Sequence, residues 1–190
     1  MAKSNTHLEI EVKLACDSVD ALRNAGLDLS IVKPRYFEDN WLFDFADQRL
    51  FKTGAALRVR KVENQGLVTY KGIVMNSATS PLKVREEIET EVAQPEHLAT
   101  LFERLGLHRS FRYQKYRTDY RVKLADKFVS VTFDETPMGN FIEIEGDETE
   151  VLAVMQAAGF RAEDIIRESY PELQVKRCRE IGIPVKDLVF

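Results

Sequence analysis

The chain has few cysteines and no long apolar run. These two absences argue against a zinc site and against a membrane-spanning helix. Only Cys16 and Cys178 are cysteines among its 190 residues. They lie far apart and form no CxxC pair, which predicts two free thiols and disfavours a zinc site. No uninterrupted apolar run approaches the roughly 18 residues that a membrane-spanning helix needs. The first seven residues lack the apolar core of a signal peptide, so we expect a cytoplasmic protein without membrane contacts.

An excess of basic charge is also missing. The formal net charge is −4, and a mildly acidic chain is a poor candidate for binding nucleic acid through a broad basic surface. We therefore expect no specific nucleic-acid partner. Hydrophobic residues make up 44% and charged residues 31% of the chain, as in a soluble globular protein. No internal repeat or low-complexity segment is evident, and the length suits one domain over residues 1–190.

Apolar and charged residues alternate along much of the chain, which predicts a protein dominated by strands. The predicted strands cover residues 7–14, 34–45, 56–62, 67–72, 83–92, 111–122, 128–134 and 141–145. Helices are predicted at 19–25, 95–105, 149–158, from 163 onward and at 171–181, with a connecting turn region at 47–54 and a polar loop at 73–81. Few strands are separated by the helix-length crossovers of parallel sheets, so the sheet should be mostly antiparallel.

The first predicted strand carries Glu9, Glu11 and Lys13, with Ile10 and Val12 between them. Residues two apart share one face of a strand, so two carboxylates and an ammonium lie together. Neighbouring carboxylates repel each other unless a cation neutralises them, and hard cations such as Mg²⁺ prefer carboxylate oxygens. This face is therefore a candidate for binding a divalent metal.

The same alternation recurs on later strands. Charged residues share a face at Arg58 and Arg60, at Lys71 beside Thr69, at Arg85, Glu87 and Glu89, at Lys115 and Arg117, at Asp134 and at Glu143 and Glu145. On any single strand, the ordinary interpretation is a solvated outer face. If the sheet closes into a barrel, however, these faces can line a polar tunnel. Arg and Lys match phosphate oxygens, and paired carboxylates match Mg²⁺ or Mn²⁺, which together predict a polyphosphate ligand with its metal ions.

Six motifs in order resemble the CYTH superfamily, also called triphosphate tunnel metalloenzymes, over essentially the whole chain. They are Glu9–Lys13 (EIEVK), 54–60 (GAALRVR), 69–72 (TYKG), 85–89 (REEIE), 115–117 (KYR) and 139–146 (GNFIEIEG). The resemblance implies an α+β fold: an eight-stranded, mostly antiparallel closed β-barrel with flanking α-helices, whose tunnel binds a triphosphate.

The resemblance also implies roles for individual residues. Phosphate contacts are expected from Lys13, Arg58, Arg60, Lys71, Lys115 and Arg117. Metal ligands are expected at Glu9, Glu11, Asp134, Glu143 and Glu145, holding Mg²⁺ or Mn²⁺. Glu9, Glu11 and Lys13 are the expected catalytic residues, with Lys13 steering the attacking water or polarising the phosphates, and Arg85, Glu87 and Glu89 are expected to face the tunnel.

Our first functional hypothesis is a metal-dependent triphosphatase acting on an organic triphosphate, such as thiamine triphosphate or a nucleotide, or on inorganic tripolyphosphate. The alternative is a class IV adenylate cyclase that converts ATP to cyclic AMP and pyrophosphate. A noncatalytic sensor of polyphosphate or nucleotide is the third hypothesis. Trp41 and its aromatic neighbours are expected to pack in the core or at the tunnel mouth, or to stack on the organic group, and a homodimer is a further expectation.

Overall fold

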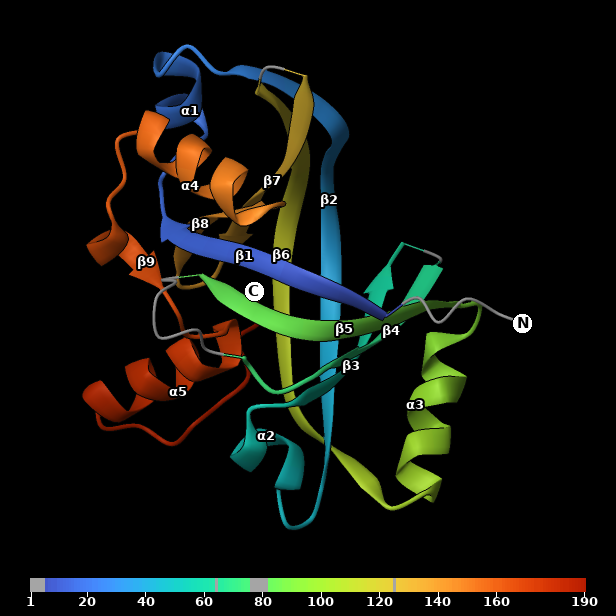
Figure 1. Cartoon of the computed structure of the whole chain (residues 1–190). Coiled ribbons are helices and arrows are strands. Elements are labelled where there is room, and N and C mark those ends of the chain that lie inside the picture. The colour runs from blue at the N-terminus through green and yellow to red at the C-terminus, as the bar shows by residue number, and fades with distance from the viewer. Residues whose placement is uncertain (1–5, 64, 76–81, 125) are drawn as a thin grey trace.

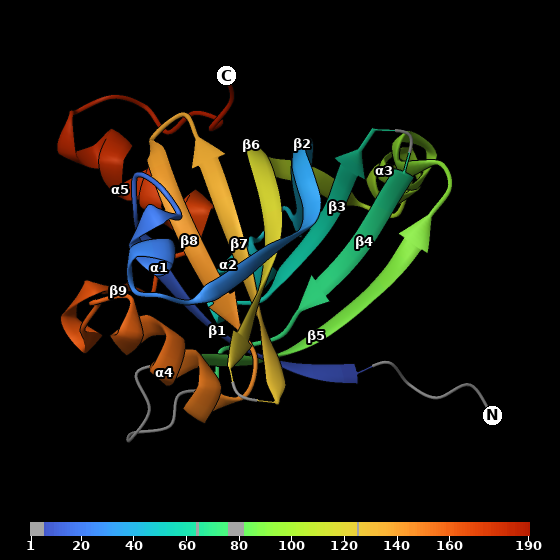
Figure 2. The same ribbon diagram turned by 90° about the horizontal axis from the view of Figure 1, so that it is seen from above.

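The computed structural model describes residues 6–63, 65–75, 82–124 and 126–190, and its strands form a closed antiparallel barrel (Figure 1). The strands of the barrel are β1 (Thr6–Ala15), β2 (Asp28–Phe45), β3 (Ala56–Val62), β4 (Gln65–Lys71), β5 (Lys83–Val92), β6 (Leu107–Leu124), β7 (Lys127–Thr136) and β8 (Gly139–Glu145). They follow the order β5-β4-β3-β2-β6-β7-β8-β1, and pairing of β1 with β5 closes the ring, as Figure 2 shows from above. The predicted α+β barrel is confirmed.

The helices lie outside this ring. They are α1 (Asp20–Asn24), α2 (Arg49–Thr53), α3 (Pro95–Arg104), α4 (Glu148–Ala157) and α5 (Tyr170–Glu180), with a 3₁₀ turn, η1, at Ala162–Asp164. Figure 2 shows α3 on one side of the barrel and α4 and α5 on the other. In the described part of the chain, no helix has both the length and the apolar character needed to cross a bilayer.

The barrel is apolar outside and charged inside. On β1 and β8 the outward residues, such as Leu14 and Ile142, are fully buried beneath α1 and α4, where they meet Val151 and Met155. On the opposite side, Phe43 and its neighbours pack beneath α3. Helices rather than solvent thus cover the outer face of these strands. Because successive side chains of a strand point to opposite faces, burying the aliphatic residues outward directs the charged ones inward.

Trp41 belongs to the outward-facing set. It is 7% exposed and packs with Phe43, Val59 and Ala99 in the core beneath α3. Of the expected roles for this aromatic segment, core packing is therefore confirmed for Trp41. Stacking on a ligand in the barrel would require the side chain to face the other way.

Four elements differ clearly from the sequence prediction. Strands β2 and β6 are longer than predicted, because they pair with each other from Asp28 opposite Lys123 to Phe45 opposite Leu107. The predicted turn region at 47–54 contains the short helix α2. The prediction of a helix from residue 163 onward is wrong, because the structure has a single 3₁₀ turn there, η1 at Ala162–Asp164. Of the predicted loop at 73–81, residues 76–81 lie outside the described part of the chain.

The C-terminal segment completes the barrel wall at two places. Strand β9 (Ile165–Ile166) pairs with β1 at Lys13 and Leu14, beyond the point where β5 pairs with it. Near the end of the chain, Leu188 exchanges backbone hydrogen bonds with β6, donating to Arg112 and accepting from Gln114. Because β7 pairs with β6 only from Tyr116 onward, this segment continues the wall where β7 stops.

Candidate functional site: a charged tunnel

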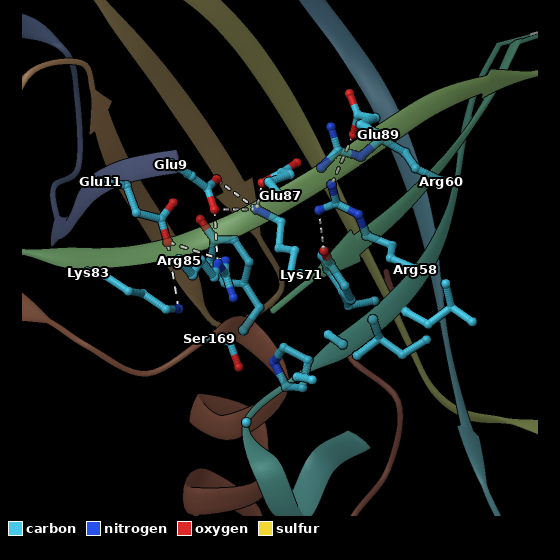
Figure 3. Close-up of a pocket in the computed structure, with 18 of the residues that line it drawn as sticks. Glu9, Glu11, Arg58, Arg60, Lys71, Lys83, Arg85, Glu87, Glu89 and Ser169 are labelled. Atoms are coloured by element: carbon cyan, nitrogen blue, oxygen red, sulfur yellow. Dashed lines mark hydrogen bonds and ion pairs between the residues drawn. The ribbon is translucent and has the colours of Figure 1, made fainter. Parts of the chain in front are cut away.

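The barrel encloses a cavity of about 1120 Å³, lined by charged side chains from β1, β3, β4, β5, β6 and β8. All the predicted phosphate contacts line it, as do the predicted metal ligands other than Asp134. Arg85, Glu87 and Glu89 line it as predicted. Figure 3 shows how carboxylates and cations from three neighbouring strands point toward one another. One cavity therefore collects both the acidic and the basic strand faces that the sequence displays separately.

Glu9 is the centre of the ion pairs on the β1–β5–β4 side of the tunnel. Its carboxylate accepts hydrogen bonds from Lys71 Nζ at 2.7 and 2.9 Å and from Arg85 Nε at 2.9 Å. Lys71 also pairs with Glu87 at 2.6 Å. Glu11 contacts Arg85 at 3.5 Å. Lys71, a predicted phosphate contact, and Arg85, predicted to face the tunnel, thus each have a carboxylate as a partner.

Arg58 and Arg60 of β3 are held in different ways. Arg58 donates to the Tyr113 hydroxyl at 3.3 Å and to Thr69 Oγ1 at 3.1 Å, and it lies 3.6 Å from Glu89. Its pKa is raised despite its burial, because Tyr113 and nearby carboxylates favour the charged form. Arg60 lies 3.1 Å from Glu38, a fully buried carboxylate that does not line the cavity.

Asp134 of β7 is covered by its hydrogen-bond donors and does not line the cavity. It is fully buried and accepts hydrogen bonds from Lys115 Nζ at 2.7 Å, from Arg117 Nε and a terminal nitrogen at 2.6 and 2.7 Å, and from the Tyr170 hydroxyl at 2.7 Å. Arg117 also bonds Glu143 at 2.5 Å. Both oxygens of Asp134 are thus occupied by protein donors, which suits a carboxylate that orients Lys115 and Arg117.

Two glutamates of β8 sit in opposite electrostatic surroundings. Burial disfavours the charged form of Glu143, but Lys115, Lys13 and Arg117 outweigh it and hold the pKa of Glu143 well below its usual range. Burial and the nearby carboxylates of Glu9 and Glu11 raise the pKa of Glu145 to about 7. In the described part of the chain, no cation lies within ion-pair distance of Glu145.

A divalent cation fits this corner of the tunnel. Glu11 lies directly opposite Glu145 in the β1–β8 pairing, and burial together with the carboxylates of Glu9 and Glu11 raises the pKa of Glu145. The donors are carboxylate oxygens, the ligand type that Mg²⁺ and Mn²⁺ prefer. Among the described residues no group of three or more acidic, His or Cys side chains is already arranged around one point. A metal held by Glu9 and Glu11 would therefore have to displace the cationic side chains that these glutamates now hold.

Sequence analysis missed three residues of the site. Lys83, which lies 3.6 Å from Glu11, shares the inward face of β5 with Arg85, so the same alternation could have identified it. Glu38 stands in an aromatic strand whose alternation is less regular. Tyr170 reaches the tunnel from α5, and no local sequence pattern predicts where a helix docks.

One end of the cavity is apolar. It is lined there by Leu42, Leu50, Phe51, Ala55 and Leu57. Phe51 is 54% exposed and stands on α2. Asp44 fixes this helix by accepting backbone N–H groups of Phe45, Leu50 and Phe51 at 2.7, 3.1 and 2.9 Å. The cavity therefore combines a charged tunnel with an apolar end that is held in place.

Comparisons with known proteins agree with this architecture. A family model described as the CYTH domain matches residues 7–170. A protein of Methanocaldococcus jannaschii named "putative adenylate cyclase" is 27% identical over 181 residues, and the match covers 88% of this chain and 98% of that protein.

Solved structures show the same fold. The X-ray structure of a Vibrio parahaemolyticus protein, also named "putative adenylate cyclase", superimposes with a TM-score of 0.70 at 20% identity, covering 88% of this chain and 97% of that one. A Hippeastrum structure superimposes with a TM-score of 0.60 at 19% identity, covering 93% and 97%. Its description gives that protein a dominant triphosphatase activity. At these identities the likeness concerns the fold alone.

Proposed function

The chain belongs to the CYTH domain family, and we propose that it hydrolyses a triphosphate in its charged tunnel with the help of Mg²⁺ or Mn²⁺. The observation that supports this proposal most directly is the composition of the cavity wall. Cationic and carboxylate side chains from separate strands line one enclosed space. A wall of this kind suits a ligand that carries both many negative charges and bound metal, and a metal–triphosphate complex has both properties.

The proposed division of labour follows from which side chains are paired. Lys71 and Arg85 exchange their carboxylate partners for phosphate oxygens. Lys115 and Arg117, oriented by Asp134, contact the phosphates from the opposite wall. Lys13 lies on the same face as the catalytic glutamates and orients the phosphate or the attacking water.

Glu9, Glu11 and Glu145 are the proposed ligands of the metal, with Glu143 beside them. When bound, the metal supplies charge neutralisation at the phosphate oxygens and lowers the pKa of a water. The protein contributes mainly positioning and electrostatic stabilisation, as is usual in phosphoryl transfer. The glutamates thus have two roles in this proposal: they hold the cations before the substrate enters and hold the metal afterwards.

A cyclase is the second candidate, since two relatives carry an adenylate cyclase name. In that reaction the ribose 3′-hydroxyl attacks the α-phosphorus of ATP and pyrophosphate leaves. The same tunnel would hold the triphosphate, and the difference lies in which phosphorus faces the nucleophile. The relative with a described dominant triphosphatase activity is the reason for placing hydrolysis first.

The apolar end of the cavity favours an organic triphosphate over inorganic tripolyphosphate. A bare tripolyphosphate has nothing to bury against Leu42, Phe51 and Leu57, whereas an organic group gains free energy there. We propose that the organic group lies against α2 while the phosphates extend along the charged wall.

Product analysis by ³¹P NMR tests the function. The purified protein is incubated with Mg²⁺ and, separately, with thiamine triphosphate, ATP and tripolyphosphate. Orthophosphate release with an organic substrate supports the proposal, and faster turnover of tripolyphosphate contradicts the organic preference. Pyrophosphate together with cyclic AMP from ATP would establish the cyclase instead. Binding without any product would favour a sensor.

A further inference from the structure

Lys13 is held by residues far away in the sequence. Its Nζ donates to the backbone carbonyl of Glu168 at 3.1 Å and lies 3.4 Å from Glu143 Oε1. It also stands over the ring of Tyr170, 4.3 Å from the ring centre. An ammonium group has three donors, and these three partners account for them. Two of these partners come from one place in the chain: Tyr170 is the first residue of α5, and Glu168 lies just before it.

The Tyr170 ring is rigidly placed. It is 4% exposed, and its centre lies 5.3 Å from that of Phe141 and 5.9 Å from that of Tyr113. Its hydroxyl donates to Asp134 at 2.7 Å. The ring therefore has a fixed orientation and presents one face to Lys13, where the π-electrons attract a cation.

The start of α5 explains why Tyr170 can serve this purpose. Ser169 caps the helix: its backbone N–H and its hydroxyl each donate to the Glu172 carboxylate at 2.7 Å. Pro171 follows in the first turn, where its fixed φ favours the helix. The helix then packs on the barrel through Tyr170, Gln174 and Cys178, which are all buried. The capped first turn thus places the Tyr170 ring beside Lys13, near the end of β1.

From this geometry we infer that Tyr170 is a positioning residue for Lys13, acting through its aromatic ring. The inference rests on the proposed function, because Lys13 is assigned there to the triphosphate. Without the ring, the ammonium loses the partner on one side and is free to turn toward Glu143 or the cavity. Small displacements of a group that acts in the transition state lower kcat more than they change substrate binding.

Three variants separate this role from general support of the fold. In Tyr170→Phe the ring stays and the hydroxyl bond to Asp134 is lost. In Tyr170→Leu both are lost. Gln174→Leu is the matched control, because Gln174 is buried one turn further along α5, donates to the Lys186 carbonyl at 3.3 Å and does not line the cavity.

With Mg²⁺ and the best triphosphate substrate, we expect Tyr170→Leu to lower kcat about tenfold or more with a smaller change in KM. Tyr170→Phe should stay within about threefold of the unchanged protein, since it retains the ring that contacts Lys13. Gln174→Leu should keep its kcat even if it lowers the melting temperature. A Tyr170→Phe variant as slow as Tyr170→Leu, or equal losses in Tyr170→Leu and Gln174→Leu, would overturn the inference.

A second measurement does not need turnover. The midpoint of urea unfolding is compared for the unchanged protein, Lys13→Met, Tyr170→Leu and the double variant, with the metal chelated. If the ring contacts Lys13, the two substitutions are not additive. Additive effects would contradict the contact. If no triphosphate is hydrolysed by the unchanged protein, the proposed function fails, and this cycle still decides whether Tyr170 holds Lys13.

Discussion

Glu9 accepts hydrogen bonds from two cations of the tunnel, Lys71 and Arg85, which makes it a sharp test of the acidic face. In Glu9→Gln, Lys71 keeps Glu87 and Arg85 keeps Glu11, so the fold should survive with little change in melting temperature. The metal loses a charged ligand, and we expect metal-dependent turnover to fall about a hundredfold or more. Steady-state kinetics over a Mg²⁺ series measures this loss.

The control for Glu9→Gln is Glu86→Gln. Glu86 lies on β5 next to Arg85, on the outer face of the barrel, and does not line the cavity. Its substitution should leave turnover unchanged. Equal activity of the two variants would show that Glu9 has no part in the reaction.

Substituting Asp134 is expected to lower the stability of the fold more than the affinity for metal. Asp134→Asn keeps the shape but leaves Lys115 and Arg117 without their shared buried anion. Breaking a buried pair typically costs about 3–5 kcal/mol in the free energy of unfolding, and we expect a loss toward the lower end because Lys115 keeps Glu38 and Arg117 keeps Glu143. Urea unfolding in the presence of a chelator measures it. Unchanged stability combined with weakened Mg²⁺ binding would favour the metal-ligand role that the family resemblance implies for this residue.

In the absence of metal, substituting Glu145 should raise the stability of the fold, whereas substituting Asp134 should lower it. The Glu145 pKa of about 7 is above that of the unfolded chain, so ionising Glu145 costs stability as the pH rises from about 4.5 through 7. With EDTA present, Glu145→Gln should melt higher than the unchanged protein at pH 8 and at the same temperature at pH 4. Thermal denaturation at the two pH values checks this. A stabilisation that is the same at both pH values would show that charge is not the cause.

At the scale of single residues, the alternation of strands predicted which charged residues share a face, and the family resemblance implied that this face points into the barrel. The charged residues of β1, β3, β4 and β5 line the cavity because a strand admits only two faces and helices cover one of them. Glu38 and Tyr170 could not be predicted in this way. The role of a buried carboxylate or tyrosine depends on which cations the fold places beside it. Those cations come from distant parts of the chain, so no local sequence pattern identifies them.

Among the elements, α2 has the clearest expected effect on specificity. Removing the ring in Phe51→Ala should raise KM for an organic triphosphate about tenfold, because apolar contact is lost, and leave KM for tripolyphosphate unchanged. Comparing the two substrates in one assay checks this. Leu101→Ala on α3 is the control, since Leu101 is similarly exposed, at 52%, and does not line the cavity. An equal rise for both substrates would refute the organic subsite.

Elements that are stabilised by distant partners were predicted least well. Ile165 and Ile166 form β9 because they find backbone partners on β1, although the surrounding sequence favours a helix. Strands β2 and β6 extend beyond their aromatic cores because each supplies the hydrogen bonds of the other. By contrast, β3 and β5 begin and end where predicted, since their regular alternation stops at clear turn signals.

For the whole molecule, closure of the barrel creates the charged cavity, and no single segment of the sequence encodes this closure. The pairing of β1 with β5 joins the first strand to one that begins at residue 83. Local patterns predicted an antiparallel sheet, while closure was predicted from the family resemblance. Once the ring is closed, charged faces that would otherwise be solvated must neutralise one another or a ligand.

This closed arrangement predicts that metal and triphosphate bind together. Lys71 and Arg85 are paired with Glu9, so a triphosphate that binds these cations releases a carboxylate next to its own negative charge. A divalent cation removes that repulsion, and the phosphate in turn removes the cations that compete for Glu9. By thermodynamic reciprocity each ligand should tighten the other by the same factor, about 5- to 150-fold.

Isothermal titration calorimetry tests this coupling with a non-hydrolysable imidotriphosphate and Mg²⁺, corrected for the complex that the two form in solution. Glu9→Gln is the diagnostic variant, because its neutral side chain neither repels the phosphate nor competes with it for Lys71 and Arg85. In this variant the imidotriphosphate should bind tighter than to the unchanged protein when EDTA is present and should gain less from Mg²⁺. If the affinity of the unchanged protein is the same with and without Mg²⁺, the carboxylates and the phosphates do not compete for the same cations, and the tunnel binds its ligand without exchanging partners.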